Sequence, residues 1–177
     1  MKIEIDQKNF DLLIEYEQLK KRIRLLGIQL NMSYERRVPV FIGVLNGSFM
    51  FLADLMKEID MAAEVSFVKI STYEGDQKSG ELKQLLGLDI DLAHRDVIIV
   101  EDIVETGETI LEVIDLVRQE KVASVAVCSL LLKPEKLLQE IPELAYVGFE
   151  IDNEFVVGYG LDYNGLGRHL KDIYKAI

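Results

Sequence analysis

The chain has 177 residues, of which 49% are hydrophobic, and we expect residues 1–177 to form a single globular domain rather than a disordered chain. Its 20 basic and 31 acidic side chains give a net charge of −11, which argues against general binding to nucleic acid or to an anionic membrane. The one cysteine has no partner for an internal disulfide, and no apolar run reaches membrane-spanning length, so we expect a cytoplasmic protein.

Apolar patterning predicts strands and helices that alternate along the chain. Residues from about 10 to 30 have apolar side chains near helical spacing and predict an amphipathic helix. Apolar runs predict strands at 38–45, 62–72, 96–100, 122–132, 145–151 and 155–161. Helices are predicted at 49–59 and 109–120, with a short closing helix within 166–177, and the first half of 73–92 is typical of a loop. This order predicts an α/β fold whose twisted, mainly parallel sheet is flanked by helices.

Ligands of such folds bind at the carboxyl ends of the strands. Polar or glycine-containing residues follow the apolar runs at 45–48, 71–75, 101–109 and 132–133. Because the carboxyl ends of parallel strands share one edge of the sheet, these four segments predict a common site.

Two neighbouring carboxylates, Glu101 and Asp102, directly follow the apolar run at 96–100. Two ionised groups at a buried strand end repel each other and lose hydration, so they need a metal ion, sugar hydroxyl groups or basic side chains as partners. Carboxylate oxygens are ligands that suit Mg²⁺. A solvated acidic turn is the alternative interpretation of the same residues.

The next segment contains Thr106, Gly107, Glu108 and Thr109 and leads into a predicted helix. The free N–H groups and the positive dipole end of a helix N-terminus favour phosphate, and Gly107 would let a ligand approach the backbone. An ordinary threonine N-cap is the alternative. The P-loop pattern and the G-x-G-x-x-G pattern are absent, which disfavours nucleoside triphosphate and dinucleotide sites.

The stretch VIIVEDIVETGET, residues 97–109, resembles the phosphoribosyl-diphosphate-binding signature of the type I phosphoribosyltransferases. That signature is an apolar strand, two acids, two apolar residues, a third acid and Thr/Ser-Gly-x-Thr. The segments GVLNGSFMFLADL, STYEGDQKSGELK, SLLLKP and VGFEIDNEFVVGYGLDYNGLGR resemble the hypoxanthine-guanine phosphoribosyltransferases of purine salvage. The resemblance covers about residues 38–170. It implies the type I phosphoribosyltransferase fold, with a small hood formed by the N-terminal segment and about residues 140–177.

The resemblance also implies how the sugar and the phosphates are bound. Glu101 and Asp102 would hold the ribose hydroxyl groups, partly through Mg²⁺, and Asp162 would bind a second magnesium ion. The 5′-phosphate would lie against Thr106, Gly107, Glu108 and Thr109, and pyrophosphate against Asn46, Gly47, Ser48 and Arg168. Asn46 stands where the family often has lysine. Thr72 and Tyr73 would belong to a lid that excludes water.

On the purine side, the resemblance implies that Glu105 is the general base at N7, a position where the family has aspartate. The extra methylene of glutamate moves the carboxylate by roughly 1.5 Å. Lys133 would donate to the 6-oxo group and so select 6-oxopurines over adenine. Phe155 would stack on the purine ring, and Val156 would contact the base edge through its backbone.

The resemblance thus predicts an enzyme that transfers the 5-phosphoribosyl group of phosphoribosyl diphosphate to N9 of hypoxanthine and, as a second base, of guanine. The products would be IMP or GMP and pyrophosphate. Two alternatives remain: a sister transferase that prefers xanthine, and a regulatory phosphoribosyl-diphosphate-binding protein without catalysis, which the glutamate at 105 keeps open. The family also implies a homodimer or a homotetramer.

Overall fold

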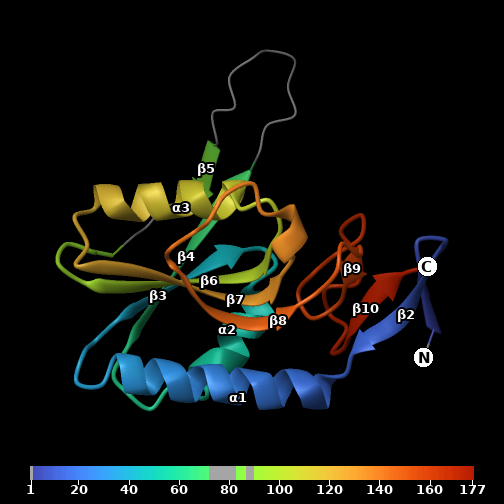
Figure 1. Cartoon of the computed structure of the whole chain (residues 1–177), viewed down its shortest axis with the longest axis horizontal. Helices are drawn as coiled ribbons and strands as arrows, with labels where there is room; N and C mark the ends of the chain where they lie inside the picture. The colour runs from blue at the N-terminus through green and yellow to red at the C-terminus, as the bar shows by residue number, and fades with distance from the viewer. Residues whose placement is uncertain (1, 72–82, 87–89) are drawn as a thin grey trace.

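The computed structural model describes residues 2–71, 83–86 and 90–177. The described chain forms two β-sheets. Figure 1 shows a large sheet that lies between helices and a smaller sheet beside it, close to both chain termini. No helix in these described ranges is long and apolar enough to cross a membrane.

The large sheet has six strands in the order β5-β4-β3-β6-β7-β8. Its five parallel strands are β3 (Val40–Leu45), β4 (Glu64–Ser71), β6 (Asp96–Val104), β7 (Ser124–Leu132) and β8 (Leu144–Glu150). The short strand β5 (Lys83–Leu86) pairs antiparallel with β4 at the edge. The predicted α/β fold with a mainly parallel sheet is confirmed.

Helices cover both faces of this sheet. Helix α3 (Glu108–Gln119) lies on one face, and α1 (Tyr16–Ser33) and α2 (Phe49–Met56) lie on the other (Figure 1). Because side chains alternate along a strand, β6 serves both cores. Ile98 and Val100 pack in the core with α1 and α2, whereas Val97 and Ile99 pack in the core with α3. All four side chains are completely buried, so the strand that carries the candidate site is held from both sides.

The smaller sheet joins the two ends of the chain. It contains β1 (Lys2–Ile5), β2 (Lys8–Ile14), β10 (Ile173–Ala176) and β9 (Val156–Val157), in this order and antiparallel throughout. Figure 1 shows it on the side of the molecule toward which the parallel strands of the large sheet point.

Two of the helix predictions are wrong where this smaller sheet forms. Residues 10–14, predicted to begin the first helix, belong to β2, and the expected closing helix is absent from the described residues 166–177, which form β10 at 173–176. Pairing of β10 with β2, in which Tyr174 lies opposite Leu12, outweighs the local helical spacing of the apolar residues. No pattern within one short segment could reveal a pairing between the two ends of the chain.

Two predicted strands begin or end at other residues in the structure. The strand expected at 155–161 is reduced to β9, because Gly158 and Gly160 have φ angles of 100° and 102° and turn the chain away. The strand expected at 96–100 continues to Val104. Glu101 and Asp102 therefore lie inside β6 rather than after it.

The strand order also locates a candidate site. From β3 the chain moves outward to β4 and then returns to the other side of β3 to form β6. Open α/β sheets bind ligands outside the carboxyl ends of the strands where the order reverses in this way. The carboxyl ends of the neighbouring strands β3 and β6 meet this condition.

Candidate active site

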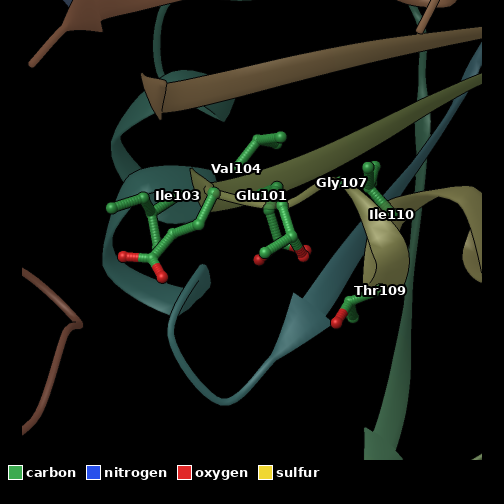
Figure 2. Close-up of a pocket in the computed structure, with 8 residues that line it drawn as sticks. Glu101, Ile103, Val104, Gly107, Thr109 and Ile110 are labelled. Carbon is green, nitrogen blue, oxygen red and sulfur yellow. The ribbon is translucent and has the colours of Figure 1, made fainter. Parts of the chain in front are cut away.

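The turn from β6 into α3 lines a pocket of about 240 Å³. Its lining residues are Glu101, Ile103, Val104, Glu105, Thr106, Gly107, Thr109 and Ile110. Figure 2 shows the Glu101 carboxylate and the Thr109 hydroxyl on the same side of this turn. The pocket therefore combines an acidic group with the N-terminus of a helix.

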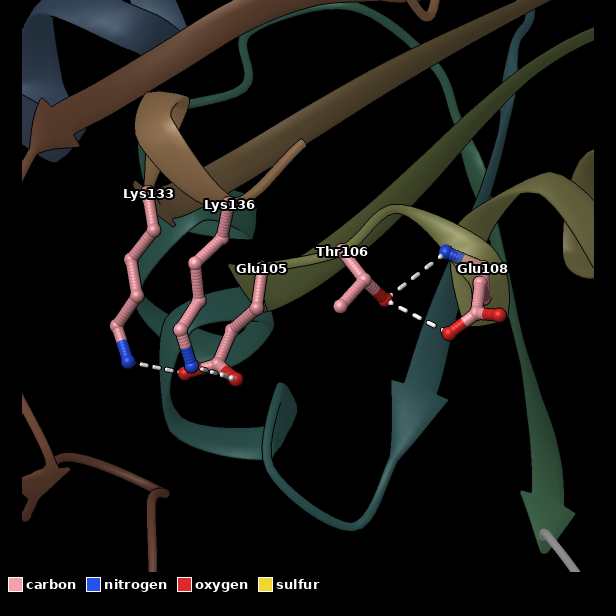
Figure 3. A network of polar contacts seen from close by, with 5 residues as sticks. All are labelled: Glu105, Thr106, Glu108, Lys133 and Lys136. Atoms are coloured by element: carbon pink, nitrogen blue, oxygen red, sulfur yellow. Dashed lines mark hydrogen bonds and ion pairs between the residues drawn. The ribbon is translucent and has the colours of Figure 1, made fainter. Parts of the chain in front are cut away.

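Gly107 shapes the turn from β6 into α3. It is the N-cap of α3 and has a φ of 89°, a left-handed conformation that favours glycine. Gly107 has no side chain to cap the helix, and the Glu108 N–H donates to Thr106 Oγ1 at 3.4 Å, so the later N–H groups of the first turn are the ones available to an anion. Thr106 Oγ1 donates to Glu108 Oε2 at 3.2 Å, which holds the Glu108 carboxylate beside Thr106 (Figure 3). This turn can bind a phosphate mainly through its backbone.

Glu101 and Asp102 form a buried acidic pair, with only 7% and 8% of their surfaces exposed. Burial, and then the neighbouring charge of Asp102, raises the pKa of Glu101 well above its ordinary value of 4.5. Burial also raises the pKa of Asp102, while the positive charge of Arg168 acts in the opposite direction. The two carboxylates thus lose hydration, and the positive charge of Arg168 only partly offsets this loss.

Such a pair fits a magnesium ion. Mg²⁺ is usually held by one or two carboxylates together with substrate oxygens and water, and it prefers oxygen ligands. Within residues 2–71, 83–86 and 90–177, no group of three or more His, Cys, Asp or Glu side chains could hold a metal ion. Glu101 and Asp102 would therefore supply part of the coordination shell, and a bound substrate would supply another part.

The turn between β3 and α2 lies against Asp102. A Cβ atom at Gly47 would collide with the Asp102 carboxylate, so a larger residue there would displace this carboxylate. The peptide bond between Leu45 and Asn46 is cis. Both the backbone N–H of Ser48 and its Oγ donate to the Val44 carbonyl, at 3.3 and 2.7 Å. Of the three residues predicted to bind pyrophosphate here, Ser48 thus has its donors engaged within the turn.

The chain around Arg168 completes this side of the site. Gly160 lies so close to the Gly47 carbonyl that a Cβ atom would collide with it. Arg168 Nη1 donates to the Gly160 carbonyl at 2.7 Å, and Arg168 Nη2 pairs with Asp162 Oδ1 at 2.6 Å. The structure therefore brings Gly47, Asp102 and Arg168 together, and it pairs the predicted magnesium ligand Asp162 with the predicted pyrophosphate ligand Arg168.

A second group of charges lies at the end of β7. Lys133 is buried, and its ammonium group pairs with Glu105 Oε1. Lys136 Nζ lies 3.6 Å from Glu105 Oε2 (Figure 3). The two residues predicted to contact the purine edge are thus direct neighbours. The sequence interpretation missed Lys136, although its position three residues after Lys133 in a turn that Pro134 opens was a usable signal.

Phe155 directly precedes β9 and is 45% exposed. Its ring packs edge-to-face against Tyr163, with 5.7 Å between the ring centroids, and the Lys8 ammonium lies 4.9 Å from the centroid of the Phe155 ring. Val156 is buried in β9 and pairs with Lys175 of β10. Thr72 and Tyr73, the predicted lid residues, lie outside the described residues.

Relatives with known names support one family. A 40% identical protein, the hypoxanthine-guanine phosphoribosyltransferase of Staphylococcus aureus strain Mu50, aligns over 161 residues, which are 90% of this chain and 89% of that protein. The bifunctional protein TilS/HprT of Listeria monocytogenes is 43% identical over 159 residues. That alignment covers 89% of this chain but only 24% of the Listeria protein, so the chain spans about a quarter of its length.

Solved structures agree with these relatives. A hypoxanthine-guanine phosphoribosyltransferase from Bacillus anthracis, with a HEPES molecule in its active site, has a TM-score of 0.88 and 35% identity, and the match covers 94% of this chain and 96% of that one. A hypoxanthine phosphoribosyltransferase from Staphylococcus aureus also has a TM-score of 0.88, with 38% identity and coverage of 94% and 91%. The family model of the phosphoribosyl transferase domain matches residues 14–164. The chain therefore belongs to the phosphoribosyltransferase family, and it has the type I fold that its sequence predicted.

Proposed function

We propose that the protein is a magnesium-dependent 6-oxopurine phosphoribosyltransferase. It would transfer the phosphoribosyl group of phosphoribosyl diphosphate to N9 of hypoxanthine and guanine, and release IMP or GMP together with pyrophosphate. The observation that carries the proposal is the contact between the buried ammonium of Lys133 and the carboxylate of Glu105, beside the phosphate-binding turn of α3.

This pair of charges suits one edge of a 6-oxopurine. The 6-oxo group accepts a hydrogen bond and N7 carries a proton in one tautomer, so a lysine and a carboxylate side by side match these two neighbouring atoms. Adenine would place its amino group against the Lys133 ammonium, donor against donor, in a buried position. Lys133 and Glu105 would thus select hypoxanthine and guanine over adenine.

The remaining residues would hold the sugar and both phosphate groups. Glu101 and Asp102 would bind the ribose hydroxyl groups and Mg²⁺, and residues 106–109 would bind the 5′-phosphate. Bound Mg²⁺ neutralises negative charge on the diphosphate that departs. Arg168, with the backbone at Asn46 and Gly47, would bind pyrophosphate, and Asp162 would contribute to a second magnesium site.

In the reaction the purine N9 forms a bond with C1′ of the ribose as the bond from C1′ to the diphosphate oxygen breaks. The purine enters with a proton on N7 and must lose it. Glu105, held at the end of β6, would accept this proton, and Lys133 would stabilise the 6-oxo group as charge shifts within the ring. The site thus separates proton transfer on the purine from charge neutralisation on the diphosphate.

We also propose that the smaller sheet, with the chain around it, is the hood of the site. It carries Phe155 and Val156, and it lies on the side toward which the parallel strands point (Figure 1). Phe155 would stack on the purine, with Phe10 and Tyr163 holding its ring. A cytoplasmic homodimer or homotetramer remains a prediction from the family.

A panel of bases tests the proposed function. Purified protein is mixed with MgCl₂, phosphoribosyl diphosphate and, in turn, hypoxanthine, guanine, xanthine or adenine, and nucleotide formation is followed by chromatography. We expect IMP and GMP, no AMP, and no product when EDTA replaces magnesium. XMP as the main product would support the xanthine-preferring alternative. Binding of phosphoribosyl diphosphate without any nucleotide would support the regulatory alternative.

Shortening the candidate base is a sharper test of its role. The Glu105→Asp variant, which restores the family residue, is expected to keep the turnover number or raise it, because the carboxylate can still reach N7. The Glu105→Gln variant cannot accept the proton, and its turnover number is expected to be lower than that of the wild type by about 100-fold or more. Steady-state kinetics with hypoxanthine measures both. An inactive aspartate variant beside an active glutamine variant would exclude Glu105 as the base.

A further inference from the structure

We propose that Lys136 is a positioning residue for the purine half of the reaction. It would hold the second carboxylate oxygen of Glu105 and keep this carboxylate in place while Lys133 donates to the purine. The inference rests on the proposed function and adds to it a residue that the resemblance to the family does not assign.

The local backbone places Lys133 and Lys136 on the same side of a turn. Lys136 ends the short 3-10 helix η1 (Pro134–Lys136), and its N–H donates to the Lys133 carbonyl at 3.0 Å. A 3-10 helix has three residues per turn, so side chains three positions apart lie above one another. Figure 3 shows both lysine side chains extended from this turn toward the Glu105 carboxylate. The spacing thus directs two ammonium groups at one acid.

The same turn is fixed to the chain on both sides of Glu105. The Lys133 N–H donates to the carbonyl of Val104 at 3.0 Å, and the Leu138 N–H donates to the carbonyl of Thr106 at 3.1 Å. Val104 and Thr106 are the two sequence neighbours of Glu105. The backbone that carries the lysines and the backbone that carries the carboxylate are therefore held together by hydrogen bonds on both sides of Glu105.

The two lysines have different environments and so different roles. The Lys133 side chain is 4% exposed, whereas Lys136 is 35% exposed and Glu105 39% exposed. Lys133 pairs with Oε1, and Lys136 lies near Oε2. When the Lys133 ammonium donates to the 6-oxo group of a purine, Lys136 is the cation that stays with the carboxylate. It would limit the rotation of the glutamate side chain, which is longer than the aspartate of the family.

The length of the side chain at 105 decides whether Lys136 can act in this way. The Lys136 to Glu105 distance of 3.6 Å is already near the outer limit of an ion pair. An aspartate would withdraw the carboxylate by roughly 1.5 Å, beyond contact with Lys136. The contribution of Lys136 is therefore expected with glutamate at position 105 and absent with aspartate. Because exposed ion pairs add little to stability, it should appear in catalysis and not in the melting temperature.

The test is a mutant cycle with hypoxanthine as substrate. Lys136→Gln is expected to lower kcat about tenfold, without a change in the melting temperature or in the KM for phosphoribosyl diphosphate. Lys136→Arg is expected to retain most of the turnover, because it keeps the charge. In the Glu105→Asp background, Lys136→Gln is expected to have no effect. Lys20→Gln is the matched control, since it removes another exposed lysine, paired with Glu17 at 2.8 Å on α1.

The outcomes separate this inference from the proposed function. If the wild-type protein makes nucleotide and Lys136→Gln has the same kcat, the inference is overturned and the function stands. An equal loss in the wild-type and Glu105→Asp backgrounds would also overturn it, because the effect would not pass through the glutamate. A wild-type protein that makes no nucleotide from any base overturns the proposed function, and this inference with it.

Discussion

Replacing Lys133 by methionine is expected to raise the KM for hypoxanthine by about 10- to 100-fold. Methionine fills much of the same buried space but cannot donate to the 6-oxo group, and a hydrogen bond to a charged group contributes about 1.5–3 kcal/mol. The substitution also removes the cation that pairs with Glu105 Oε1. Initial rates at varied hypoxanthine measure the effect, and the KM for phosphoribosyl diphosphate should stay within about twofold, because other residues bind the sugar.

A control variant and one contradicting outcome make the Lys133→Met prediction testable. Lys20→Met changes the charge of the protein by the same amount on α1, on the opposite face of the sheet from α3, and should leave the kinetics unchanged (Figure 1). An unchanged KM for hypoxanthine in the Lys133 variant would show that the buried ammonium does not contact the base.

Replacing Glu101 by glutamine is expected to stabilise the ligand-free protein at neutral pH and to reduce activity by at least about 100-fold. Burial, followed by the charge of Asp102, raises the pKa of Glu101 well above 4.5. The folded protein thus keeps a proton that the unfolded chain releases, so the free energy of unfolding of the wild type falls as the pH rises above 4.5. Glutamine has no such dependence. The stability advantage of the variant should therefore appear above this pH and grow as the pH rises toward the raised pKa of Glu101.

Thermal unfolding between about pH 4 and pH 8, with and without magnesium and phosphoribosyl diphosphate, checks both parts of this prediction. The ligands should stabilise the wild type and leave the Glu101→Gln variant almost unchanged. Glu17→Gln, an exposed change on α1, is the control. A variant that is less stable than the wild type at neutral pH, or one that keeps full activity, would contradict the assignment of Glu101 as a ligand-binding acid.

The fold was predictable where the signal is local. The apolar run before Glu101 and the alternation of apolar and polar residues in 109–120 identify β6 and α3 from the sequence, and these elements form the centre of the site. Residues 10–14 of β2 and the strand β10 were predicted to be helical. In the structure they are strands that pair with each other, and this pairing is not visible in either segment alone. Pairing between distant strands leaves no periodic pattern in the sequence. The helical spacing of the apolar residues in 10–30 was therefore the stronger signal.

The site was predictable in a similar way. Glu101, Thr106, Gly107 and Thr109 come from one continuous segment and line one pocket, so their proximity was predictable from the sequence. The contacts of Gly47 with Asp102, and of Lys136 with Glu105, join segments that are distant in the chain. They depend on strand order and on a 3-10 turn, which a sequence pattern does not specify. The engaged donors of Ser48 follow from the tight turn after β3 and were not foreseen.

Phe155 illustrates how the smaller sheet would contribute to the proposed site. Its ring is held by Phe10 and Tyr163, and the Lys8 ammonium lies close to all three rings. Lys8 and Phe10 precede residues 14–164, which the family model matches. An aromatic ring that is already oriented before the purine arrives loses less entropy on binding. The hairpin of β1 and β2, which carries Lys8 and Phe10, is therefore expected to increase the affinity of this chain for the purine.

A crystal structure with IMP tests the central claim most directly. The account predicts that the 5′-phosphate lies on the N–H groups of residues 106–109 and that the ribose hydroxyl groups lie beside Glu101 and Asp102. The purine 6-oxo group should accept a hydrogen bond from Lys133, with N7 next to Glu105. A nucleotide bound elsewhere, or bound with this purine edge turned away from Lys133 and Glu105, would contradict the account.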